Sequence, residues 1–263
     1  MELELALSLA EILSSLLFLL VLGLEDLKTR ELNNKLVYSY LAIAVVFYVL
    51  TLTTSRSLIE SLVYTAFTLL VTPGVFLVLY KYKLTGDGDV YVSLALGLSL
   101  FHPLVYKATL VRCGVISPAL VSVLYASLTA TLYTVIQGLV NIVIHREILD
   151  QVPAKYRAIV ALAARPVRVG DYIENQRYKH YYPVQEFKLS KQGLVVEFHL
   201  GGLNESSKQS LLELVEKGFV PRDQFIWVTQ GIPYIFYMFI GLVLLVLIGD
   251  KPLYYILVKL IGY

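Results

Sequence analysis

The sequence predicts an all-α polytopic membrane protein of six transmembrane helices, with a small α+β soluble cytoplasmic domain between the fifth and sixth helices. Three observations predict this fold class. Hydrophobic residues make up 57% of the 263 residues. Charged residues make up only 16%, whereas soluble domains average about 25%. The apolar residues also gather into long uncharged runs, and about 20 such residues in a helix cross the hydrocarbon core of a bilayer.

Six apolar segments are the predicted transmembrane helices. They are residues 5–24, 36–53, 58–80, 90–106, 115–144 and 232–248. The fourth is the weakest because His102-Pro103 interrupts it, and the fifth is longer than one span requires. After the sixth, Gly-Asp-Lys-Pro at residues 249–252 predicts a helix break. The tail that follows is predicted to lie at the membrane interface, where its tyrosines reach headgroup depth.

The sequence predicts three consecutive parts, which are residues 1–144 with five helices, a soluble domain over 145–230, and residues 231–263 with the sixth helix. The middle part contains 12 basic and 10 acidic residues, which is the charge density of a soluble domain. Its residues 184–200 predict a β-hairpin that turns at Lys191-Gln192-Gly193. Residues 204–217 predict an amphipathic helix that ends at Gly218.

The distribution of basic residues predicts the orientation in the cell membrane. The loops after the first and third segments contain Lys28, Arg30, Lys35, Lys81 and Lys83. The loops on the other side contain Arg56, Lys107 and Arg112. Short cytoplasmic loops carry an excess of Lys and Arg. The chain is therefore predicted to place the soluble domain in the cytoplasm and both termini outside.

Charge and metal-binding residues exclude several function classes. The net charge is only +2, and no arginine-rich run is present, so nucleic-acid binding is not expected. A thiolate zinc site needs several cysteines, and the chain has only Cys113. The four histidines show no metal-ligand spacing (His102, His145, His180 and His199). We therefore expect no metal and no cofactor.

Two aspartates are the candidate catalytic residues. Asp26 follows the first apolar segment and Asp89 begins the fourth, so the predicted topology places both at the cytoplasmic edge of the membrane. Ionisable side chains at membrane depth are costly, which makes them functional candidates. Two carboxylates that share one proton can hydrolyse a peptide bond. The ionised one takes a proton from water, and the protonated one polarises the carbonyl group.

The residues beside Asp89 form the pattern Gly86-Asp87-Gly88-Asp89. Glycines remove Cβ atoms, so the backbone can bend sharply and a substrate can approach closely. A polar turn between two helices explains the same pattern equally well. The residue types alone do not favour Asp89 over Asp87, nor Asp26 over its neighbour Glu25.

Lys28 and Arg30 follow Asp26 and have two interpretations. They either anchor the helix at anionic lipid headgroups or stabilise the ionised form of Asp26. The residues by themselves leave both interpretations open.

Two motifs resemble those of the archaeal preflagellin and prepilin peptidases, which are type IV prepilin peptidase-like aspartic proteases. The first is D-x-[KR]-x-R-x-[IL]-x-[ND] at residues 26–34, and the second is G-x-G-D at residues 86–89. Residues 226–233 are similar to the family's W-V-T-P-x-I-P stretch, although Gln230 replaces a proline. Residues 248–250, Ile-Gly-Asp, also look similar. The resemblance covers nearly the whole chain.

The resemblance implies that Asp26 and Asp89 are the catalytic pair and that Gly86 and Gly88 give the substrate access. It implies a membrane endopeptidase that removes the short basic leader from preflagellin (archaellin) and pilin-like precursors at the cytoplasmic membrane face. The acidic residues next to the pair are candidates for binding the leader's lysines and arginines. They are Asp87, Glu25 and Glu31.

Two alternative functions remain at this stage. A presenilin-like intramembrane aspartic protease shares the G-x-G-D motif, but its first aspartate follows a tyrosine, whereas Glu25 precedes Asp26 here. A transporter or a non-enzymatic membrane scaffold also keeps membrane aspartates, but no inverted repeat of broken helices is present. The sequence does not predict which precursors are cut or the oligomeric state.

Overall fold

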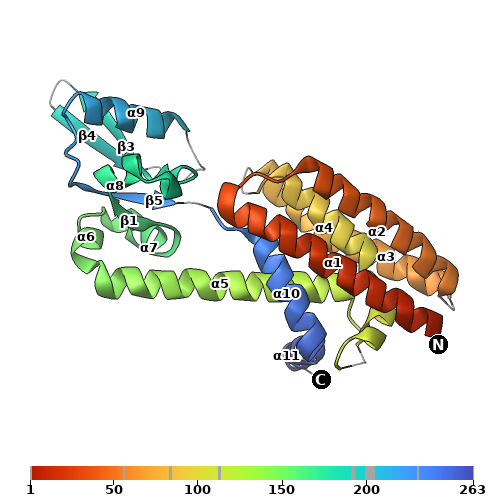
Figure 1. The fold of residues 1–263 in the computed structure, drawn as a ribbon. Helices are drawn as coiled ribbons and strands as arrows, with labels where there is room; N and C mark the ends of the chain where they lie inside the picture. Colours follow the sequence, from red (N-terminus) through yellow and green to blue (C-terminus); the bar gives the residue numbers. More distant parts are fainter. Residues whose placement is uncertain are drawn as a thin grey trace. The chain divides into compact units, whose positions relative to one another are not determined.

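The computed structural model describes residues 2–55, 57–82, 85–111, 114–190, 193–198, 205–229 and 231–262. The chain folds into two compact units. We call Met1–Ala130 with Pro233–Tyr263 the membrane unit, and Thr131–Ile232 the sheet unit. Figure 1 shows the helices of the first and the mixed helices and strands of the second.

The membrane unit is built from helices. They are α1 (Glu2–Thr29), α2 (Asn34–Thr54), α3 (Leu58–Lys81), α4 (Asp87–Ser99), the 3₁₀ helix η1 (Pro103–Ala108), the first part of α5 (Pro118–Ile144), α10 (Tyr234–Ile248) and α11 (Lys251–Ile261). Among the described residues, α1, α2, α3 and α5 are long and apolar enough to cross a membrane. The mostly helical membrane fold is thus confirmed. The predicted fourth and sixth spans form the shorter helices α4 and α10, of 13 and 15 residues.

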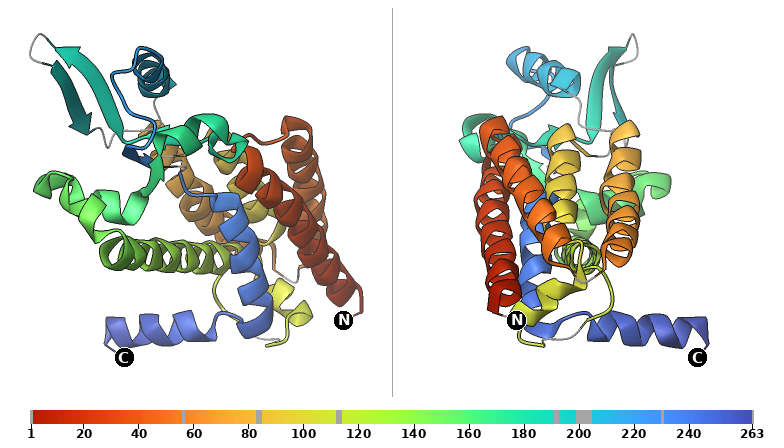
Figure 2. Two further views of the ribbon diagram at one scale, coloured as in Figure 1. Left: turned by 60° about the vertical axis from the view of Figure 1, so that its left-hand side comes forward. Right: turned by 90° about the vertical axis from the view of Figure 1, so that its right-hand side faces the viewer.

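The fourth predicted segment divides into two helices, and His102 caps the start of the second. Its Nδ1 atom accepts a hydrogen bond from the Leu104 N–H at 3.1 Å, and Pro103 then begins η1. Helix α4 therefore stops at Ser99. It packs against α2 and α3, and the two helices cover it from both sides (Figures 1 and 2).

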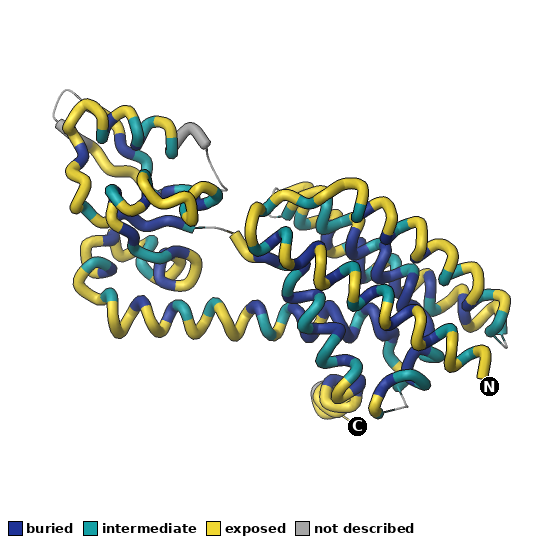
Figure 3. Tube along the Cα trace, in the orientation of Figure 1, coloured by how far each residue is buried: buried dark blue, intermediate teal, exposed yellow. Residues whose placement is uncertain are grey.

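Helix α1 has one buried face. Its buried residues recur every three or four positions, which is the period of one helix face (Ser8, Glu11, Ile12, Ser15, Leu19, Leu22, Gly23 and Asp26). On other faces, Leu13 and Leu17 are 62% and 61% exposed, which suits contact with lipid. Figure 3 shows exposed and buried residues alternating along these helices.

Two glycines set the position of α10. A Cβ atom at Gly23 of α1 would lie 2.9 Å from the Cα atom of Phe236, so the backbones of α1 and α10 approach closely there. A Cβ atom at Gly241 of α10 would lie 2.1 Å from the carbonyl oxygen of Ser122 in α5. These contacts bring the beginning of α10 to the last turns of α1, where Asp26 lies.

Two buried polar residues of α1, Glu11 and Ser8, have partners within the membrane unit. Glu11 accepts a hydrogen bond from the Thr51 hydroxyl and so connects α1 to α2. The Ser8 hydroxyl donates to the Leu104 carbonyl at 3.1 Å. Such bonds matter in an apolar environment because an unpaired polar group there is costly.

The predicted helix break after the sixth segment is confirmed. Gly249 has a φ of 67° and ends α10. The Asp250 carboxylate accepts the N–H groups of Val115 and Ile116 at 2.8 and 3.1 Å. The tail forms α11, which runs off at an angle to α10 and exposes Tyr254 and Tyr255 (Figure 2).

The sheet unit contains two small antiparallel sheets. In the first, β5 (Phe225–Thr229) lies between β1 (Arg165–Arg168) and β2 (Tyr182–Pro183). In the second, β3 (Gln185–Ser190) pairs with β4 (Gly193–Phe198), which confirms the predicted pairing. Lys191 and Gln192 of the predicted turn lie outside the described residues. Ile226 and Val228 form part of the buried core.

Short helices complete the sheet unit. They are α6 (Arg146–Asp150), α7 (Ala154–Ala163), α8 (Val169–Glu174), the 3₁₀ helix η2 (Gln176–Tyr178) and α9 (Glu205–Glu216). Gly218 follows α9 with a φ of 76°, which confirms the predicted C-terminal glycine. The last turns of α5 also belong to this unit because the Asn141 side-chain amide donates to the carbonyls of Ala161 and Ala164, each at 2.7 Å. The unit thus contains the predicted domain 145–230 and begins upstream of it.

Candidate active site

Asp26 lies in the last turn of α1 and is only 8% exposed. Its Oδ2 atom accepts the backbone N–H of Ile235 at 3.3 Å, and its Oδ1 atom forms an ion pair with Nη1 of Arg30 at 3.5 Å. Ile235 is in the first turn of α10, where backbone N–H groups lack partners within the helix. The carboxylate of Asp26 therefore sits at the positive end of α10.

The end of α1 has an unusual backbone. Arg30 has a φ of 57°, and it is the only non-glycine residue with a positive φ among those the structure describes. The Arg30 N–H still donates to the Asp26 carbonyl at 3.3 Å. The left-handed conformation costs an L-residue about 1–2 kcal/mol. It turns the chain sharply, and the guanidinium group returns to Asp26.

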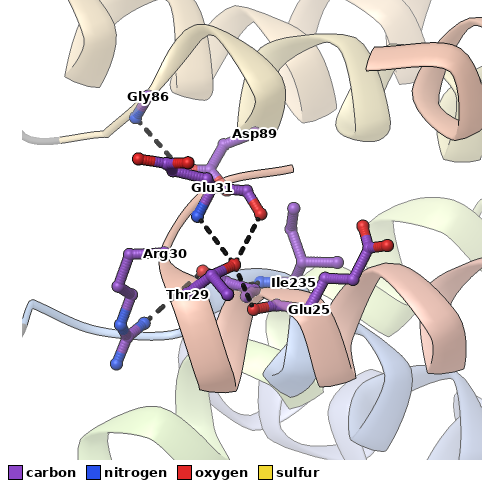
Figure 4. A network of polar contacts seen from close by, with 8 residues as sticks. Glu25, Thr29, Arg30, Glu31, Gly86, Asp89 and Ile235 are labelled. Carbon is purple, nitrogen blue, oxygen red and sulfur yellow. Dashed lines mark hydrogen bonds and ion pairs between the residues drawn. The ribbon is translucent and has the colours of Figure 1, made fainter. Parts of the chain in front are cut away.

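Side chains hold the turn after α1. The Thr29 hydroxyl donates to the carbonyl oxygens of Glu25 or Glu31, each at 3.0 Å, and also accepts the Glu31 N–H. The Glu25 carboxylate accepts the Asn33 N–H at 3.1 Å. In Figure 4, the carboxylate of Glu25 and the guanidinium of Arg30 point to opposite sides of α1. Glu25 therefore stabilises the connection to α2.

Asp89 lies in the first turn of α4. Its Oδ2 atom accepts the backbone N–H of Gly86 at 3.2 Å, which is the position of an acidic helix-capping residue. The positive end of the helix dipole favours a carboxylate here. This contact also fixes the orientation of the side chain.

The two glycines of G-x-G-D have different surroundings. A Cβ atom at Gly88 would lie 2.4 Å from Cδ1 of Leu32, so this position is filled by the α1–α2 connection. Gly86 is exposed, and a Cβ atom there would meet only the Gly88 nitrogen, at 4.0 Å. Gly88 thus allows the end of α1 to pack on the start of α4. Of these two glycines, only Gly86 has open space beside it.

This packing brings the two aspartates into one site. Asp89 interacts electrostatically with Asp26, Arg30 and Asp87. Arg30 also interacts with Tyr237, and Asp89 with Tyr234, both from α10. Figure 4 shows Asp89 extending from α4 toward the last turn of α1. Three helix ends therefore meet at two carboxylates that are far apart in the sequence.

The other charged residues of the two motifs differ in their exposure and contacts. Lys28 is exposed, whereas the Arg30 side chain is 15% exposed and contacts Asp26. Glu31 and Asp87 are exposed near the pair, and Oδ1 of Asp87 accepts the neighbouring Gly88 N–H at 2.9 Å. Lys28 and Arg30 had two interpretations, anchoring at lipid headgroups or stabilising the ionised form of Asp26. The contact with Asp26 supports the second interpretation for Arg30.

Sequence reasoning did not identify Ile235 as part of the site. The resemblance includes residues 226–233 but implies no role for them in the site, and Gln230 lies outside the described residues. The sequence feature that could have identified Ile235 is Pro233. It precedes the first turn of α10 and marks the start of a helix, where backbone N–H groups are able to bind a carboxylate. Within the described residues, no cluster of three or more His, Cys, Asp or Glu side chains suits a metal ion.

An apolar helical unit that gathers two aspartates at the ends of its helices is the arrangement that a membrane aspartic peptidase requires. Residues 13–135 match the model of the type IV leader peptidase family, and residues 156–251 match that of the archaeal peptidase A24 C-terminus, type II. The first match includes both aspartates. The chain belongs to the type IV leader peptidase family and is a membrane protease of the prepilin and preflagellin peptidase type. No curated protein matches the chain.

Proposed function

We propose that this protein is an aspartic endopeptidase of the cell membrane that removes the short basic leader from preflagellin and pilin-like precursors. The observation that carries the proposal is the convergence of Asp26 and Asp89 at one site. Family membership supports the class of substrate. The basic residues of the first and third connections favour an active site at the cytoplasmic face, with both termini outside.

The reaction needs one proton shared between the two carboxylates. The ionised aspartate takes a proton from a water molecule, and the hydroxide oxygen attacks the carbonyl carbon of the scissile peptide bond. The protonated aspartate gives its proton to the carbonyl oxygen, and a tetrahedral intermediate forms. The intermediate collapses when a proton reaches the leaving nitrogen and the C–N bond breaks. The chemistry uses no metal or cofactor.

The position of the pair defines where the cut falls. Both aspartates lie at helix ends next to polar connections, so water is available and the scissile bond lies beside the apolar helix of the substrate. This differs from a presenilin-like protease, which cuts within an apolar segment.

Glu31 and Asp87 are exposed acidic residues beside the pair, so we propose that they attract the basic leader. Glu25 contributes less because its carboxylate already accepts the Asn33 N–H. Charge reversal by Glu31→Lys or Asp87→Lys should raise KM for a precursor with a basic leader and change kcat little. The reversal Glu213→Lys in α9 is the control because Glu213 is an exposed acidic residue outside the two aspartate motifs. An unchanged KM in both variants would exclude this role.

The proposed function is tested with the purified protein in liposomes and a synthetic archaellin precursor. Mass spectrometry of the products should show one cut, between the leader and the apolar segment. A cut within the apolar segment would instead support the presenilin-like alternative. An intact precursor under conditions where the protein remains folded would contradict the proposal.

A further inference from the structure

We propose that Asp26 is the ionised member of the catalytic pair, that Asp89 carries the proton, and that Arg30 is the positioning residue that sets this division. The inference rests on the proposed function and adds to it a separate role for each carboxylate. Asp26 then activates the water, and Asp89 protonates the carbonyl oxygen of the substrate. The contacts of the individual carboxylate oxygens carry the argument.

Both oxygens of Asp26 face donors. Oδ2 accepts the Ile235 N–H at 3.3 Å, and Oδ1 faces the Arg30 guanidinium at 3.5 Å. A guanidinium group and a backbone N–H have no acceptor capacity. Each of these contacts is stronger when the oxygen carries negative charge. The two donors therefore favour the ionised form of Asp26.

Asp89 has a different environment. Its Oδ2 atom accepts the Gly86 N–H at 3.2 Å, and no donor among the described residues is directed at Oδ1. A proton on Oδ1 therefore meets no opposing donor and remains free to reach the substrate. The burial of Asp89, and then the negative charges of Asp26 and Asp87 nearby, also favour its protonated form.

Arg30 is the cation among the described groups that interact with the pair. Asp26 faces Arg30 and the α10 N-terminus, while Asp89 faces Asp26, Asp87, Arg30 and Tyr234. Arg30 also interacts with Tyr237. The guanidinium group forms its ion pair with Asp26, so it acts most strongly on that carboxylate.

The backbone of Arg30 gives an independent reason to assign it a role. Residues with a φ near +57° after a helix are usually glycine or asparagine, which adopt this conformation more easily than arginine. Backbone geometry therefore does not explain an arginine here. Its side chain does, because the sharp turn directs the guanidinium group back to Asp26, at the unfavourable negative end of α1.

The test compares Arg30→Asn and Arg30→Lys with the wild-type enzyme in liposomes, with kcat/KM measured from about pH 4 to about pH 10. Asparagine fits the left-handed conformation and removes the charge, whereas lysine keeps the charge. In Arg30→Asn, the acid-side midpoint of the profile should rise by about one pH unit, and the alkaline-side midpoint should move less. Activity one unit below the wild-type midpoint should fall about tenfold.

Arg30→Lys should keep its acid-side midpoint close to that of the wild type. Two results for Arg30→Asn would overturn the inference, because Asp89 would then be the ionised member. They are an unchanged acid-side midpoint and a shift of the alkaline-side midpoint that exceeds the acid-side shift. An equal shift in Arg30→Lys would also overturn it. If Arg30→Asn fails to fold, Arg30→Gly is measured in its place, since glycine also fits the turn.

Asp26→Asn and Asp89→Asn are included to separate the two proposals. If they abolish cleavage while the Arg30→Asn profile matches that of the wild type, this inference fails and the proposed function stands. If both variants still cleave the precursor, the proposed function itself fails.

Discussion

Replacing Gly88 by alanine tests whether close packing at the start of α4 assembles the site. The added Cβ atom would lie 2.4 Å from Cδ1 of Leu32 and 3.4 Å from its Cγ atom. Carbon atoms in contact are normally about 3.5–4.0 Å apart, so the Leu32 methyl group must move by more than about 1 Å. Leu32 belongs to the connection that follows Asp26. Its displacement therefore separates the end of α1 from the start of α4.

The effect on stability should be small and the effect on activity large. Forcing an extra carbon into a packed site costs about 1–3 kcal/mol. Alanine regains up to about 1 kcal/mol over glycine in a helix, so the net loss is on the order of 1 kcal/mol. That corresponds to a fall in melting temperature of about 2–4 °C for a protein of this size. A 1 Å error in the placement of catalytic groups can lower the rate about 100-fold.

The assay combines melting temperature with cleavage of the synthetic precursor. Gly86→Ala is the matched control because its Cβ atom meets nothing closer than 4.0 Å. It should melt like the wild type. The double variant Leu32→Ala/Gly88→Ala removes the clash and should recover activity toward that of Leu32→Ala alone. Full activity in Gly88→Ala would show that this contact does not assemble the site.

Two further predictions concern the pair and its contact with α10. Because the reaction needs one ionised and one protonated carboxylate, cleavage should fall at low pH, when both are protonated, and at high pH, when both are ionised. A flat profile from about pH 4 to about pH 9 would contradict a shared proton. Gly23→Ala should push α1 from α10 and lower kcat, since its Cβ atom would lie 2.9 Å from the Phe236 Cα atom and the Asp26–Ile235 bond would lengthen. Gly74→Ala in α3, whose nearest neighbour is 4.0 Å away, should retain normal kcat. Equal kcat values in the two variants would argue against this contact.

The parts of the fold that depend on local sequence could be predicted. The apolar runs form helices, the alternating residues around Phe187 form the β3–β4 hairpin, and Gly218 and Gly249 end helices with positive φ angles. Each of these features follows from the period of apolar residues or from the conformational freedom of glycine. The two candidate catalytic aspartates were likewise predicted from two short motifs, each continuous in the sequence.

The contacts that build the site could not be predicted, because they join residues far apart in the sequence. The Ile235 N–H that binds Asp26 is 209 positions away, and no local pattern links the two. The Gly88–Leu32 contact likewise depends on how two connections pack. The polar residues Gln137 and Asn141, four positions apart in an apolar helix, do indicate one long-range contact. They mark a protein-facing side of α5, where both donate to the Ala164 carbonyl.

The most direct test of the central claim is cleavage of the synthetic archaellin precursor by the single variants Asp26→Asn, Asp89→Asn and Asp87→Asn in liposomes. Asparagine keeps the shape of each side chain and removes its acid–base function. We expect no detectable cleavage by the first two variants, and an unchanged kcat in Asp87→Asn, with all three melting near the wild-type temperature. Cleavage at the wild-type rate by either Asp26→Asn or Asp89→Asn would contradict the assignment of these two residues as the catalytic pair.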